Sequence, residues 1–280
     1  MNSTRPRLAV LIDADNTSAK YVDALLDELA KYGAATVKRA YGDWTTPQLG
    51  SWKAELNKHA IGPVQQFAYT TGKNSTDSAL IIDAMDLLYS GNLEAFALVS
   101  SDSDFTRLAT RIRESGMTVY GLGLRKTPAS LVAACDKFIY LEVLGDEPED
   151  GDEAEPLPDL EPLLRRAVDS TSQDDGWAHL GAVGTYLTST NTSFDPRNYG
   201  FPKLIALAQA QPFLEVENSA TGSARVRLKT ATRRRRSSGA AKKAAAKAAA
   251  ALPEVAAVAD QPGKTAAKKT TSTRTRKRSS

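Results

Sequence analysis

The chain has 280 residues, of which 41% are hydrophobic and 25% are charged, enough apolar material for a buried core in one or two domains. A single cysteine, Cys135, excludes an internal disulfide and a cysteine-based zinc cluster. Two histidines, His59 and His179, argue against a histidine-ligated metal. A metal in this protein would therefore be held mainly by carboxylates, the ligands that Mg²⁺ and Mn²⁺ prefer.

Hydrophobic periodicity predicts alternating strands and helices over residues 7–143. The pattern favours a parallel sheet covered by helices, with Gly33 ending the first helix and Gly62-Pro63 ending the second. We expect strands at residues 8–13, 35–42, 63–69, 95–101, 118–124 and 137–144. We expect helices at residues 22–29, 48–59, 77–89, 105–115 and about 128–134.

The rest of the chain divides into three parts. Residues 145–159 contain eight acids and three prolines, a composition typical of a linker that cannot bury enough apolar surface to fold. Residues 160–229 predict three helices followed by a β-hairpin, which is a winged-helix pattern. Residues 230–280 are a low-complexity run of lysine, arginine and alanine, which we expect to be largely disordered on its own.

Charge is distributed unevenly along the chain. Residues 225–280 contain 17 lysines and arginines against two acids, whereas residues 1–224 contain 19 basic and 31 acidic residues. An acidic folded part with a basic tail is the usual electrostatic pattern of a protein that binds nucleic acid. A nuclear targeting signal and a solubilising segment are alternative explanations of the tail.

Acidic residues lie at the ends of two of the expected strands, with Asp13 as the last residue of the first and Asp102 directly after the fourth. In an open parallel sheet, ligands bind outside the carboxyl ends of the strands near a topological switch point. If these two strands are neighbours, both acids converge, and Asp77, which begins the helix before the fourth strand, could point at the same cleft. Such acids would raise one another's pKa unless a divalent cation bound between them, and a cation so placed favours phosphodiester hydrolysis. Each acid taken alone, Asp104 included, also fits a helix cap.

Three segments that contain these acids, LAVLIDADN, GKNSTDSALIIDAMDLL and ALVSSDSDFTRLATRIRESGMTVYGLG, resemble the NYN domain of the PIN-like nuclease superfamily (LabA-like group). The resemblance covers about residues 7–143 and implies a PIN-like αβα sandwich in a domain of residues 1–144, with an Mg²⁺- or Mn²⁺-dependent ribonuclease site. It places the metal-binding acids at Asp13, Asp77 and Asp102, an accessory catalytic acid at Asp104, and polar cleft residues at Asn16 and Ser101. Lys73 fits either a phosphate contact or a solvated loop lysine.

Residues 160–229 are similar to the OST-HTH or LOTUS module through GWAHLGAVGTYL (176–187), FDPRNYGFPKLIALAQAQPFLEVE (194–217) and the hairpin. This winged-helix family is associated with RNA binding or protein contacts. The resemblance implies RNA contacts from the polar turn and helix start, in particular from Arg197 and Lys203. A second copy of the chain or another protein as the partner of this domain is left open.

These features predict a metal-dependent ribonuclease, in which the linker lets the winged-helix domain present RNA to the cleft. Single-stranded DNA remains open as a substrate. No apolar run is long enough to span a bilayer or to serve as a signal sequence, so we expect a cytoplasmic protein without membrane contact.

Two other functions are compatible with parts of the sequence. One is a non-catalytic RNA-binding or scaffold protein that retains the acids without turnover. The other is a phosphatase of the haloacid dehalogenase type, because Asp13 and Asp15 fit the nucleophile and general acid of a D-x-D-x-T motif. The absence of an evident cap insertion and of a clear lysine motif before Asp102 argues against the phosphatase.

Overall fold

The computed structural model describes residues 5–67, 75–145, 156–218 and 223–229. The first domain alternates strands and helices in chain order, as the periodicity predicts. Its elements are β1 (Arg7–Asp13), α1 (Val22–Leu29), β2 (Ala34–Gly42), α2 (Trp52–His59), β3 (Gly62–Gln65), α3 (Ser75–Tyr89), β4 (Ala95–Val99), α4 (Thr106–Glu114), β5 (Thr118–Gly123), α5 (Ala129–Ala134) and β6 (Lys137–Tyr140).

Within the described residues, the six strands form one parallel sheet in the order β3-β2-β1-β4-β5-β6. The chain moves outward from β1 to β2 and β3, and then returns to the other side of β1 with β4, so the topological switch point lies between β1 and β4. Ile12 pairs with Val99 in this register. Asp13, the last residue of β1, and Ser100, the residue after β4, therefore lie side by side at the switch point. This is the place where α/β proteins bind ligands.

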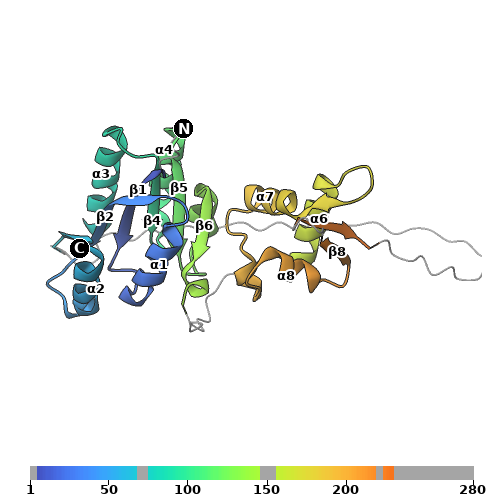
Figure 1. Ribbon diagram of the computed structural model, residues 1–280. Coiled ribbons are helices and arrows are strands. Elements are labelled where there is room, and N and C mark those ends of the chain that lie inside the picture. The colour runs from blue at the N-terminus through green and yellow to red at the C-terminus, as the bar shows by residue number, and fades with distance from the viewer. Residues whose placement is uncertain (1–4, 68–74, 146–155, 219–222, 230–280) are drawn as a thin grey trace, which may run out of the picture. The chain divides into compact units, whose positions relative to one another are not determined.

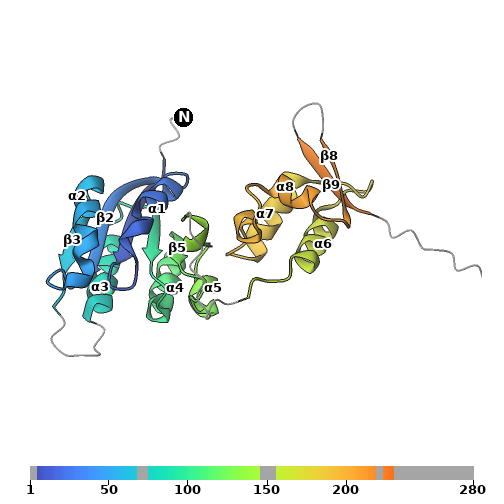
Figure 2. The same cartoon turned by 90° about the horizontal axis from the view of Figure 1, so that it is seen from below.

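Strand β1 is buried on both faces because helices cover both sides of the sheet. Leu8, Val10 and Ile12 pack in one cluster with α1 and α2, whereas Ala9 and Leu11 pack in a second cluster with α3, α4 and α5. Figure 2 shows the same division, with α1 and α2 on one face and α3, α4 and α5 on the other. A continuous apolar run is the pattern expected of such a strand. The predicted αβα sandwich is confirmed (Figure 1).

The predictions that Gly33 and Gly62 end the first two helices are wrong. Helix α1 ends at Leu29, and Gly33 does not have the positive φ of a helix-ending glycine. Position 33 has no room for a larger residue, because a methyl group there would lie 2.5 Å from the carbonyl oxygen of Pro6. Helix α2 ends before Gly62, through Ala60 in the left-handed conformation at φ 49°, and Gly62 and Pro63 belong to β3.

The second domain consists of helices and a small antiparallel sheet. Its elements are α6 (Leu160–Thr171), β7 (Ala178–His179), α7 (Leu180–Thr190), the 3-10 helix η5 (Pro196–Tyr199), α8 (Leu204–Gln209), β8 (Leu214–Asn218) and β9 (Ala224–Leu228). The three helices and the β8–β9 hairpin agree with the winged-helix prediction. The short strand β7, which the sequence analysis did not predict, pairs with β9 and completes a three-stranded sheet in the order β7-β9-β8.

Several predictions lie outside the described residues. They are the phosphate contact of Lys73, most of the acidic linker of residues 145–159, and the basic tail of residues 230–280. In the part of the chain that is described, no helix combines the length and the apolar character needed to cross a membrane.

Candidate metal centre

Asp13 is the last residue of β1 and is completely buried. Its carboxylate is fixed by two side chains: Ser100 donates a hydrogen bond of 2.7 Å from Oγ to Asp13 Oδ2, and Asn16 donates one of 2.9 Å from Nδ2 to the same oxygen. Burial raises the pKa of Asp13, and the hydrogen bonds from Asn16 and Ser100 oppose that rise. The two donors thus orient a carboxylate that the fold has removed from water.

Three further acids converge beside it. Asp77 lies in the first turn of α3, Asp102 caps the 3-10 helix η3 (Ser103–Phe105), and Asp104 belongs to that 3-10 helix. Each of them offers a carboxylate oxygen, and these three oxygens lie within 4.8 Å of one another. We call Asp77, Asp102 and Asp104 the carboxylate cluster. The backbone N–H of Asp104 donates a 2.9 Å hydrogen bond to Asp102 Oδ1, which holds two of its members together.

The surroundings of Asp77 in the cluster raise its pKa from 3.8 to about 6. Burial is the largest cause, and the negative charges of Asp13, Asp102, Asp104 and Asp15 add to it in that order. A carboxylate so placed is costly to ionise unless a cation joins it. The donor set consists of carboxylate oxygens, so the residues present fit a hard divalent ion such as Mg²⁺ or Mn²⁺.

A second group in the described residues meets the same distance condition but differs in its charge balance. Asp23, Glu55 and His59 each offer a ligand atom within 4.8 Å of the others. Lys58 donates a hydrogen bond to Asp23 and lowers the pKa of that carboxyl, and His59 lies within 2.7 Å of the same side chain. Lys58 pairs with both Asp23 and Glu55 and therefore already compensates these acids, so we assign the candidate metal centre to the carboxylate cluster.

The carboxylate cluster shares two members with the predicted set of metal ligands. Asp77 and Asp102 come together as expected, but the third acid within 4.8 Å is Asp104, for which the sequence implied an accessory role. Asp13 is not a member of that group. It is nevertheless the carboxylate with the strongest electrostatic effect on Asp77, so it belongs to the same centre.

Two consecutive serines follow β4, and they differ in what they contact. Ser101, the residue that the sequence placed in the cleft, accepts a 2.8 Å hydrogen bond at Oγ from the backbone N–H of Leu124 after β5. Ser100 instead bonds to Asp13 and accepts a 3.1 Å hydrogen bond from the backbone N–H of Asp102. Ser100 therefore joins the two strand ends, a role that the sequence analysis missed.

Asp15 is a second residue whose position the sequence analysis did not use for the metal centre. Its Oδ2 accepts a 2.9 Å hydrogen bond from Thr76 Oγ1 at the start of α3. Its Oδ1 accepts a weaker one of 3.4 Å from the backbone N–H of Asp43 after β2. Asp15 therefore ties the segment after β1 to the helix that carries Asp77.

The two RNA contacts expected in the second domain have different surroundings. The side chain of Lys203, at the residue before α8, is exposed. Arg197, in η5, forms ion pairs with Asp195 at 2.7 Å and with Glu28 of the first domain at 2.8 Å. Two carboxylates thus already contact the guanidinium of Arg197, and its contact with RNA stays a prediction.

Comparisons with known proteins agree with the two-domain organisation. Residues 7–142 match the family model of the NYN domain, and residues 155–226 match that of the OST-HTH/LOTUS domain. None of the curated proteins matches the chain.

Three solved structures are similar to parts of the chain. A protein of unknown function from Vibrio parahaemolyticus shares 16% identity at a TM-score of 0.44, covering 55% of this chain and 98% of its own. An uncharacterized protein from Nitrosomonas europaea shares 27% identity over 31% of this chain and 88% of its own, at a TM-score of 0.25. A protein from Chromobacterium violaceum shares 36% identity over 26% of this chain and 82% of its own, at a TM-score of 0.23.

Proposed function

We propose that this chain, in which an NYN domain is followed by an OST-HTH/LOTUS domain, is a ribonuclease that depends on Mg²⁺ or Mn²⁺. The observation that carries the proposal is the carboxylate cluster at the switch point of the sheet, with the pKa of Asp77 raised to about 6 by burial and by its acidic neighbours. Three acids gather here from two separate segments, and one of them, Asp102, also caps η3.

The carboxylate cluster would hold the ion. When bound, a divalent cation polarises a phosphate oxygen, lowers the pKa of water and stabilises the leaving oxygen of a phosphodiester. Asp13, held by Ser100 and Asn16, adds a fixed negative charge beside the cluster. Direct ligation by Asp13, which the sequence resemblance implies, stays a prediction.

RNA would be bound mainly outside the first domain, because residues 1–144 contain 15 basic and 16 acidic residues and offer no net attraction to a polyanion. The basic residues of the C-terminal tail supply the attraction. In the OST-HTH/LOTUS domain, Lys203 is our candidate for a direct phosphate contact because its side chain is exposed at the start of α8. Asn16 is exposed beside Asp13 and remains a candidate for substrate contact close to the metal centre.

A cleavage assay with end-labelled RNA and single-stranded DNA, each with Mg²⁺, Mn²⁺ or a chelator, tests the proposal. The variant is Asp102→Asn, and its matched control is Asp86→Asn, an exposed acid on the helix that carries Asp77. We expect cleavage of RNA with metal, none with chelator, and a loss of about 100-fold or more for Asp102→Asn. Asp86→Asn should retain the wild-type rate.

The same assay separates the ribonuclease from a non-catalytic RNA-binding protein. The second function would be supported if the wild-type chain bound RNA with full affinity, took up Mn²⁺ and left the RNA intact under every condition. Equal cleavage by the wild type and Asp102→Asn would instead point to a contaminating nuclease, and the proposal would be withdrawn.

A further inference from the structure

Glu28 has an unusual position for an acid. It lies in the last turn of α1, where the helix dipole disfavours negative charge, and its side chain is only 4% exposed. No basic residue of α1 itself occupies that turn. A buried carboxylate at the negative end of a helix requires strong partners from elsewhere in the fold.

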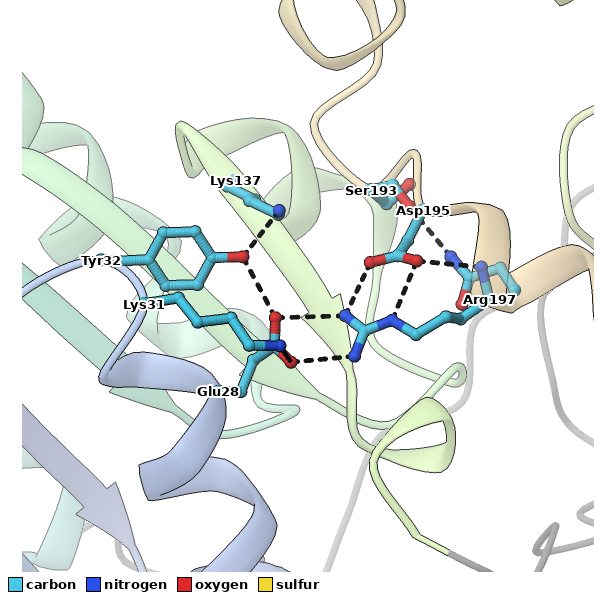
Figure 3. Close-up of polar contacts among 8 residues, drawn as sticks. Glu28, Lys31, Tyr32, Lys137, Ser193, Asp195 and Arg197 are labelled. Carbon is cyan, nitrogen blue, oxygen red and sulfur yellow. Dashed lines mark hydrogen bonds and ion pairs between the residues drawn. The ribbon is translucent and has the colours of Figure 1, made fainter. Parts of the chain in front are cut away.

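The main partner of Glu28 comes from the second domain, 169 residues later in the chain. Arg197 donates hydrogen bonds of 2.8 Å and 3.1 Å to the two oxygens of Glu28, a bidentate arrangement. The other edge of the same guanidinium contacts Asp195 through bonds of 3.0 Å and 2.7 Å. Figure 3 shows Arg197 between these two carboxylates.

The two carboxylate oxygens of Glu28 also accept hydrogen bonds from residues of the first domain. Lys31 donates a 2.7 Å hydrogen bond to Oε2, and the hydroxyl of Tyr32 donates one of 3.2 Å to Oε1. Lys137, the first residue of β6, donates in turn to the hydroxyl of Tyr32 (Figure 3). Burial would raise the pKa of Glu28, but the hydrogen bonds from Arg197 and Lys31 outweigh it and lower that pKa to about 2.

An independent set of contacts involves the outer edge of the sheet. Strand β6 is the last strand in the sheet order, and the backbone N–H of Phe138 in that strand donates a 2.8 Å hydrogen bond to the carbonyl of Thr192. Thr192 Oγ1 donates one of 2.9 Å to the carbonyl of Val132 at the end of α5. The side chain of Arg125 donates a third, of 3.1 Å, to the carbonyl of Asn198.

We propose that residues 191–199 form a docking segment that fixes the OST-HTH/LOTUS domain on the NYN domain, with the Glu28–Arg197 pair as its central contact. The segment occupies the backbone N–H of Phe138 on the edge strand β6, and it supplies the cation that Glu28 requires. The two domains then act as one body, whatever the length of the linker between them. RNA held by the second domain is thereby presented to the metal centre in a fixed position, a consequence that rests on the proposed function, whereas the docking itself does not.

Hydrogen–deuterium exchange of the full chain, measured without metal or RNA, tests the docking. The amide of Phe138 reports on it directly, because its partner is the carbonyl of Thr192. In the wild type we expect this amide to be protected. Arg197→Met should make it exchange about tenfold faster or more, Glu28→Gln should do the same, and the double variant should add little to either, because both break one contact.

Arg165→Met is the matched control, because Arg165 pairs with Glu161 on the surface of α6 within the same domain. It should leave the exchange of Phe138 unchanged. Amides of β1 and β4 in the centre of the sheet show whether a variant remains folded, and they should keep their protection in all variants. Fast exchange of Phe138 in the wild type, or equal exchange in the wild type and a folded Arg197→Met, would overturn the proposal.

Discussion

Buried carboxylates occur in two regions of this molecule, and the fold treats them in opposite ways. At the carboxylate cluster, Asp77 is surrounded by other acids and its pKa rises to about 6. At the docking segment, Glu28 is surrounded by donors and its pKa falls to about 2. The comparison teaches that burial alone does not identify a functional acid. The sign of the shift separates a charge that the fold already neutralises from one that the fold leaves uncompensated.

Breaking the compensated pair should have the largest effect on stability. Arg197→Met leaves Glu28 with Lys31 and Tyr32 only, and we expect the folded chain to lose up to about 3 kcal/mol in urea unfolding. Changing both partners, as Glu28→Leu with Arg197→Met, should recover part of the loss because no unpaired acid remains at that position. If the losses of unfolding free energy in the two single variants add up in the double variant, the two side chains are not directly coupled.

The uncompensated acid should behave in the opposite way. Without metal, Asp77→Asn removes the repulsion at the cluster, so we expect it to stabilise the folded chain by about 1 to 3 kcal/mol at pH 7 while it abolishes metal-dependent cleavage. The gain should depend on pH. Because the pKa of Asp77 in the folded chain, about 6, lies above its ordinary value of 3.8, its contribution to stability is complete below pH 3.8 and is lost as the pH rises through 6.

Urea unfolding of the wild type and of Asp77→Asn, in chelator from pH 4.5 to 7.5, measures this dependence. The advantage of the variant should grow with pH. Glu28 has the reverse dependence, because its folded pKa is lowered: its contribution is present above pH 4.5 and is lost as the pH falls toward 2. A constant difference between wild type and Asp77→Asn across the range would show that Asp77 is not under the repulsion described.

A smaller effect is expected from Ser100, which orients Asp13 and receives the backbone N–H of Asp102. Ser100→Ala should lower the cleavage rate about tenfold at saturating RNA, because the carboxylate of Asp13 loses one of its two side-chain donors. Ser101→Ala is the control, since Ser101 bonds to the backbone of Leu124 and to none of the acids. If the two variants had equal cleavage rates, Ser100 would have no special positioning role.

The smallest effect on the fold is expected from the tail. Removing residues 230–280 should leave unfolding unchanged and should flatten the salt dependence of RNA binding, because 14 lysines and arginines would no longer release counterions. Cleavage at saturating RNA should persist. An unchanged salt slope would exclude the tail as the main electrostatic contact. By contrast, the Glu28–Arg197 pair is partly buried and is therefore screened much less, so salt should not release the docking segment.

Much of the fold follows from local patterns that the sequence displays. Apolar runs such as residues 8–12 define strands covered on both faces, and the rule for parallel sheets brings the acids at the carboxyl ends of β1 and β4 to one edge of the sheet. Ser100 and Ser101 illustrate what the patterns leave undecided. They are adjacent residues of the same type, and which one contacts Asp13 depends on the way the chain turns at the end of β4.

Glu28 could not be predicted for a different reason. In the helical pattern of α1 it resembles any solvated acid near a helix end, and its partner lies 169 residues away in another domain. The local sequence around Arg197 likewise gives no sign of the pair, and the family resemblance there implies a contact with RNA. A charged residue reveals its role from local sequence only when its partner is local, and the docking segment depends on a contact between domains.

The hydrogen bond between Phe138 and Thr192 has a practical consequence. A fragment that ended at residue 144 would contain every acid of the proposed centre, yet its outermost strand would offer an open edge to the same strand of another molecule. Such a fragment would tend to associate and precipitate. An inactive preparation of it would then report on its solubility and say nothing about its chemistry.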